Sequence, residues 1–134
     1  GFCNAVYFVV SSAVTKPGPF TQVDADLVLR LPPPDIEKWR HIKTANEVAV
    51  LQYVKAHTSI PVPTVLASVA DAGASVIGME YILMECVKGV VLSDIWEGLD
   101  DATRRAYVDA FIGVVVELRK VPPFPALGAF LDSD

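Results

Sequence analysis

Apolar positions recur with a strand-like period near the start of the chain. Residues Ala5–Val10 are apolar on both faces of a two-residue repeat, which predicts a strand that is buried or covered on both sides. A turn over Ser11–Asp26, which contains two prolines and a glycine, separates it from a second apolar run at Leu27–Leu31. We expect these strands to form a hairpin. The prolines at 32–34 should end the second strand, because proline has no N–H for a ladder.

The apolar period lengthens to that of a helix in the next segment. Asp35 can cap a stretch that we expect to be mostly helical to about His57. Two further strands are predicted over Thr64–Ala70 and Met79–Val87, with a polar turn between them. The sequence therefore places one main helix between two pairs of strands.

A bend at Gly89 separates these strands from a segment of helical character. We expect a short helix over Leu92–Leu99 and a longer one that Asp100 or Asp101 caps and that runs to about Val121. The apolar positions of the longer helix share one face: they are Tyr107, Phe111, Val114, Val115 and Leu118. A small, mostly antiparallel sheet carrying one main helix, followed by further helices, is an α+β pattern.

Composition narrows the class of protein. The chain has 134 residues, the length of one domain, and 52% of them are hydrophobic against 20% charged, which is typical of a globular protein. The net charge is −5 and the basic residues are scattered, which argues against a nucleic-acid partner. No apolar run approaches the ~20 residues that span a bilayer, so we expect no membrane partner. Cys3 and Cys86 lie far apart without metal-ligand spacing, which favours ordinary thiols in a cytoplasmic protein.

One carboxylate of the predicted helix lies in line with its apolar positions. Glu47 precedes apolar residues at i+3, i+4 and i+7, and a charge directed toward a core is costly unless a partner pairs with it. On the strand Leu27–Leu31, Arg30 lies on the face opposite the three leucines, where it is a natural partner for Glu47. The alternative is that Glu47 lies at the edge of its apolar stripe and that both side chains are solvated.

Several segments, taken in order, resemble the aminoglycoside phosphotransferase and choline-kinase-like family, which shares the protein-kinase-like fold. They are GFCNAVYFV, LVLRLPPP, NEVAVLQYV, IPVPTVLA, YILMECVKG and FPALGAFL. The resemblance implies a kinase-like small lobe over residues 1–87, with its first strand missing, and the start of a helical large lobe over 88–134. It also implies ATP as cofactor, with Mg in the complete protein, and a small-molecule hydroxyl acceptor of unknown identity.

The resemblance assigns two groups of residues to the phosphates of ATP. Gly1, Phe2, Cys3 and Asn4 fall where the family has its phosphate-covering loop, in which small residues and backbone N–H groups let anionic oxygens approach the chain. Arg30 matches the strand position that holds the α- and β-phosphates, and Glu47, 17 residues on, matches its partner in the main helix. Without the resemblance, residues 1–4 read equally well as an ordinary hairpin turn.

The segment YILMECVKG resembles the hinge between the two lobes. The carbonyl of Glu85 and the amide of Val87 would then face the edge of the adenine ring, and Met84 would limit the depth of the adenine site. Val28, two residues before Arg30 on the same strand face, would pack on the ring. The alternative is a plain buried strand in which Met84 fills the core.

The family's catalytic loop, of the form H-G-D-x-x-x-x-N, is absent from the sequence, and so is the later aspartate that holds magnesium. We therefore expect a fragment of a small-molecule kinase that transfers no phosphate alone, with the first helices of the large lobe exposing an apolar face. One alternative is a non-catalytic, truncated or pseudokinase-like module that binds a nucleotide or a protein. Another is an unrelated α+β interaction domain.

Overall fold

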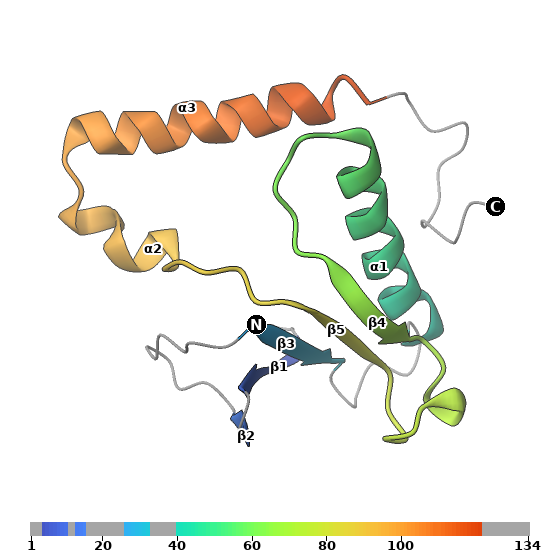
Figure 1. Ribbon diagram of the computed structural model, residues 1–134. Coiled ribbons are helices and arrows are strands. Elements are labelled where there is room, and N and C mark those ends of the chain that lie inside the picture. The colour runs from blue at the N-terminus through green and yellow to red at the C-terminus, as the bar shows by residue number, and fades with distance from the viewer. Residues whose placement is uncertain (1–3, 11–12, 16–25, 33–39, 122–134) are drawn as a thin grey trace.

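The computed structural model describes residues 4–10, 13–15, 26–32 and 40–121 of the chain, which form an antiparallel sheet with helices beside it (Figure 1). The sheet has five strands in the order β2-β1-β3-β5-β4. These are β1 (Ala5–Val10), β2 (Ala13–Thr15), β3 (Leu27–Leu31), β4 (Val65–Val69) and β5 (Tyr81–Glu85). The α+β class predicted from the sequence is confirmed.

The two strands expected to form a hairpin are neighbours in the sheet. β1 pairs antiparallel with β3, with Tyr7 opposite Leu29. The prediction of one long turn between them is wrong in part, because Ala13–Thr15 forms the edge strand β2 and pairs antiparallel with β1. This triplet contains two β-branched residues, which suit a pleated strand even in so short a segment.

The main helix, α1 (Arg40–His57), lies against the sheet at β4 and β5. Its predicted cap, Asp35, lies outside the described residues. β5 lies between β3 and β4 in the sheet, and its alternate residues Ile82 and Met84 are 2% and 5% exposed. Because alternate residues of a strand share a face, this pair marks the core under α1.

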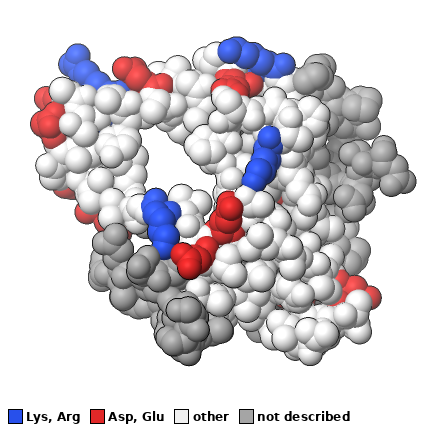
Figure 2. Space-filling model, viewed as in Figure 1, with Lys and Arg blue, Asp and Glu red and all other residues white. Residues whose placement is uncertain are grey.

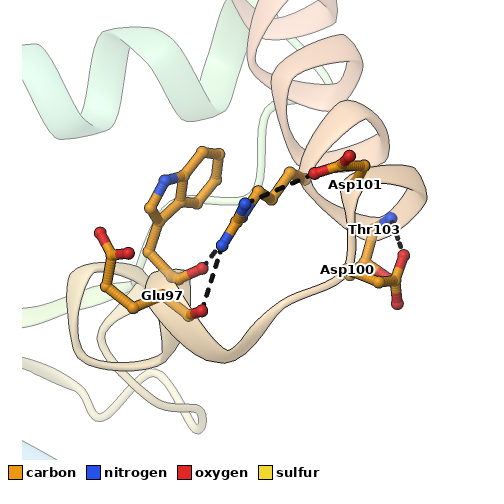
Figure 3. A network of polar contacts seen from close by, with 6 residues as sticks. Glu97, Asp100, Asp101 and Thr103 are labelled. Atoms are coloured by element: carbon orange, nitrogen blue, oxygen red, sulfur yellow. Dashed lines mark hydrogen bonds and ion pairs between the residues drawn. The ribbon is translucent and has the colours of Figure 1, made fainter.

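The helical part follows β5 and contains α2 (Leu92–Ile95), the short 3-10 helix η2 (Trp96–Gly98) and α3 (Asp101–Leu118). Of the two predicted caps, Asp100 is the one used, since its side chain accepts a hydrogen bond of 2.8 Å from the Thr103 N–H. Arg104 of α3 contacts η2, in the network of polar contacts around Glu97, Asp100, Asp101 and Thr103 that Figure 3 shows. Its guanidinium donates to the carbonyls of Trp96 and Glu97 at 3.2 and 3.1 Å, and thus ties the first turn of α3 to η2.

Helix α3 has no buried residue, and most of its apolar side chains face solvent. The exposed ones are Tyr107, Val108, Phe111, Ile112, Val115, Val116 and Leu118. Near its C-terminal end, Glu117 accepts hydrogen bonds from the Ser59 main chain and, at 2.7 Å, from its hydroxyl. Figure 2 shows a hollow between this helix and the sheet. None of the described helices is long and apolar enough to cross a membrane.

Candidate functional site

Four polar side chains meet where β1, β3 and α1 come together. Nη2 of Arg30 lies 3.4 Å from Oε2 of Glu47, and Nζ of Lys43 lies 3.8 Å from Oε1 of the same carboxylate. The Asn4 side chain donates its amide to Glu47 at 3.3 Å and accepts a hydrogen bond from Lys43. We call Asn4, Arg30, Lys43 and Glu47 the polar cluster. It joins the residue before β1 to the central strand and the helix.

The sheet register explains why Arg30 points toward α1. Arg30 lies opposite Ile82 of β5, and Val28 lies opposite Met84. Residues that are directly opposite in an antiparallel pair extend from the same face of the sheet, so these four side chains share the face on whose side α1 lies. Glu47 contacts Arg30 from the helix side, as the strand alternation and the apolar stripe predicted.

The polar cluster carries an excess of positive charge. Two cations, Arg30 and Lys43, face one anion, Glu47, which leaves one net positive charge in a chain whose total is −5. The three charged side chains are between 25% and 31% exposed, so the groups remain accessible but are partly shielded from water. A partly shielded positive excess beside a donor amide is suited to bind an anion such as phosphate.

Lys43 is a member of the cluster that the sequence analysis did not identify. It lies four residues before Glu47 on α1, the spacing at which helical side chains of opposite charge meet. That spacing was a usable signal for the ion pair. The sequence contains no comparable signal for the contact between Lys43 and Asn4, since these residues are 39 positions apart.

The end of β5 has an irregular hydrogen-bond pattern. The Glu85 N–H donates to the Thr64 carbonyl at 2.9 Å, whereas the Thr64 N–H donates at 2.9 Å to the Glu85 side chain. Hydrogen bonds from the Thr64 side chain and main chain lower the pKa of Glu85. Further along, the Cys86 N–H donates to the Asp26 carbonyl at 2.8 Å. The ladder therefore continues one residue past β5 on the β3 side.

Val87 follows this last ladder bond and is 72% exposed. In the part of the chain that the structure describes, its N–H is not seen to donate to a backbone carbonyl. Met84, by contrast, is 5% exposed and lies opposite Val28. The segment thus passes from a buried strand to an open main chain within three residues.

The structure brings together part of the predicted site. Arg30, Glu47 and Asn4 are in one cluster, and Val28 and Met84 are neighbours on the same sheet face about 7 Å along β3 from Arg30. The loop residues Gly1, Phe2 and Cys3 lie outside the described residues. Within residues 4–10, 13–15, 26–32 and 40–121, no three acidic, histidine or cysteine side chains gather as metal ligands would.

Comparison with known proteins points to one family. A model of the phosphotransferase enzyme family matches residues 1–133. Two curated proteins of Aspergillus fumigatus, from strains CBS 144.89 and ATCC MYA-4609, are each described as a subtelomeric hrmA-associated cluster protein. Each is 36% identical to this chain over 106 residues, which is 78% of the chain and 20% of the relative. The match thus spans about a fifth of these relatives' length. No solved structure gives a significant match.

Proposed function

The chain belongs to the phosphotransferase enzyme family, and from that premise we propose that it is the nucleotide-binding portion of an ATP-dependent small-molecule kinase. In this proposal residues 1–87 form the small lobe and residues 88–134 begin the large lobe. The observation that carries it is the contact of 3.4 Å between Arg30 and Glu47, on a sheet face that also presents Val28 and Met84.

The polar cluster would hold the phosphates. The Arg30 guanidinium can donate two parallel hydrogen bonds to phosphate oxygens while Glu47 fixes its direction. Lys43 supplies a second cation within 3.8 Å of Glu47, and the Asn4 amide supplies a neutral donor. A triphosphate would thus meet a net positive charge.

The base would lie further along the same face. Val28, which is half-buried, would offer apolar surface to the ring, and the buried Met84 opposite it would limit the depth of the site. We assign the amide of the exposed Val87 to the polar edge of the base. The polar edge of adenine matches a main-chain carbonyl followed two residues later by an N–H donor, so the identity of the side chains at 85 and 87 matters little for this contact. The carbonyl of Glu85 is the acceptor we assign to that edge.

The proposal covers binding and not transfer. The sequence contains no H-G-D-x-x-x-x-N segment, and the described residues contain no metal-ligand group. Phosphate transfer needs a base that orients the acceptor hydroxyl and metal ions that neutralise the phosphates. We therefore expect ATP to bind to this chain without detectable phosphorylation of a small alcohol, and we leave the acceptor unassigned.

Calorimetric titration of the full chain with ATP and magnesium tests the proposal. Arg30→Met should weaken ATP binding about 10- to 100-fold, because a hydrogen bond to a charged group contributes ~1.5–3 kcal/mol. Arg105→Met, at an exposed position on α3, is the matched control and should bind as the wild type does. No binding by the wild type at millimolar ATP, or equal binding by Arg30→Met, would refute the proposal.

A second candidate is a non-catalytic module that binds a nucleotide or a protein partner. The exposed apolar face of α3 favours it, since a face of this kind normally packs against another surface. Saturable binding of ATP that Arg30→Met weakens favours the first proposal, the nucleotide-binding portion of a kinase. Binding of protein without any response to nucleotide favours the second candidate.

A further inference from the structure

Two polar side chains, one on α1 and one just before β5, are buried and contact each other. Thr44 is 3% exposed and Glu80 is 4% exposed, and among the described residues these two are the polar or charged ones that are buried. The Thr44 hydroxyl donates to Oε2 of Glu80 at 2.7 Å across 36 residues of sequence. Neither residue belongs to the site that the family resemblance assigns.

A buried carboxylate is a costly way to fill space. Its desolvation is compensated only by hydrogen bonds or ion pairs, and a pair of apolar side chains of similar volume is often as stable or more so. Here the hydroxyl provides a charge-assisted hydrogen bond of ordinary length. A contact of this kind contributes direction as well as free energy, since it fixes a side chain of α1 against the residue just before β5.

The contact fixes the helix at the place where the polar cluster needs it. Thr44 precedes Glu47 by three residues, so the two side chains lie on neighbouring positions of the α1 surface. Glu80 precedes Ile82 by two residues, and Ile82 lies opposite Arg30. The hydrogen bond therefore joins the turn that carries Glu47 to the stretch of sheet that carries Arg30.

We propose that Thr44 and Glu80 are positioning residues for nucleotide binding, which hold α1 so that Glu47 meets Arg30. The inference rests on the proposed function. A slip of one residue along a helix moves it 1.5 Å and turns it by about 100°. Either change exceeds what a contact of 3.4 Å between Glu47 and Arg30 tolerates. The buried bond opposes such a slip, because breaking it leaves a carboxylate without its donor.

The first test is ATP affinity in the full chain, with Thr44→Val to remove the hydroxyl at constant shape and Thr44→Ser to restore it. Thr44→Val should weaken ATP binding about threefold to tenfold, and Thr44→Ser should return it to within about twofold of the wild type. In a Glu47→Ala background, Thr44→Val should change ATP affinity less than about twofold, since it acts through Glu47. Equal loss of affinity in both backgrounds, or no loss in either, would overturn the inference.

The second test needs no nucleotide. The coupling free energy between Arg30 and Glu47, measured by urea unfolding of the single and double variants, should fall by at least half when Thr44→Val is present. A wild-type chain that does not bind ATP refutes the proposed function alone, and this coupling then decides the inference. If Thr44→Val does not fold, Glu80→Met, which removes the acceptor oxygens at similar volume, replaces it in both tests. An unchanged coupling in these variants would show that the buried pair is only a structural contact.

Discussion

The ion pair between Arg30 and Glu47 can be measured as a coupling free energy. Arg30→Met removes the cation and keeps most of the side-chain length, and Glu47→Gln removes the charge at nearly constant shape. Glu47→Gln alone also disturbs the contacts of Lys43 and Asn4 with the carboxylate. Only the double-mutant cycle isolates the share that belongs to Arg30.

The geometry sets the size of this coupling. Two unit charges 3.4 Å apart interact by ~1.2 kcal/mol at the dielectric constant of water and by ~5 kcal/mol at an effective value of 20. Both side chains are about 30% exposed, which places the pair between these limits. Ordering two long side chains and removing part of their hydration offsets some of the attraction. We expect a net coupling of about 1.5 kcal/mol at 0.1 M salt.

Urea unfolding of four proteins at 25 °C gives this number, provided that the m-values agree. The pair between Arg104 and Asp101 is the matched control, because its atoms are also 3.4 Å apart but the aspartate is 89% exposed. That helical pair should couple by only ~0.3 kcal/mol. A coupling between Arg30 and Glu47 below about 0.5 kcal/mol, no greater than the control, would refute the reasoning.

Three further predictions concern the helical part. Phe111→Glu, at a site that is 67% exposed, should lower the fluorescence of a bound hydrophobic dye and change the unfolding free energy by less than ~0.5 kcal/mol. Unchanged fluorescence would contradict the exposure of the apolar face of α3. Hydrogen bonds from the Ser59 side chain and main chain lower the pKa of Glu117, so their contribution to stability is present above about pH 4.5 and is lost as the pH falls through the folded-state pKa. The difference in Tm between wild type and Ser59→Ala should therefore shrink from pH 6 to pH 3, and a constant difference would contradict this prediction. Gly89→Ala should lower the unfolding free energy by about 1 kcal/mol, because φ is +149° at this residue, although a Cβ there would meet nothing within 4 Å. Gly98→Ala, where a Cβ has equal space, should lower it by less than ~0.5 kcal/mol. Equal losses in the two variants would show that backbone conformation is not the cause.

The elements that the sequence predicted well are those with a long, regular apolar period. The helix ending at His57 and the α3 helix were both expected, and α3 ends at Leu118 rather than Val121 because its last residues form a turn instead. The strand predicted over Met79–Val87 is shorter, at Tyr81–Glu85. Its first residue, Tyr81, pairs with Val69 at the end of β4, so the strand is limited by the extent of its neighbour.

The sequence located the contact between Arg30 and Glu47 because each residue interrupts a regular apolar pattern. It did not locate the bond between Thr44 and Glu80, since burial of these side chains depends on how α1 is rotated over the sheet. Neither position differs in the sequence from an ordinary polar residue on a helix or before a strand. Long-range side-chain contacts of this kind are fixed by tertiary packing and leave no local periodicity to read.

The contact between Ser59 and Glu117 has a mechanical consequence. Among the described residues, the helical part is connected to the rest of the chain by the main chain at 86–91 and, near the C-terminal end of α3, by these hydrogen bonds to the segment between α1 and β4 (Figure 1). With these two attachments in the described part of the chain, we expect rotation about an axis through both of them to be the least restrained motion of the helices. Loss of the hydrogen bonds to Glu117, a half-buried carboxylate, would remove one of these two attachments, and we expect the helices then to move in more directions.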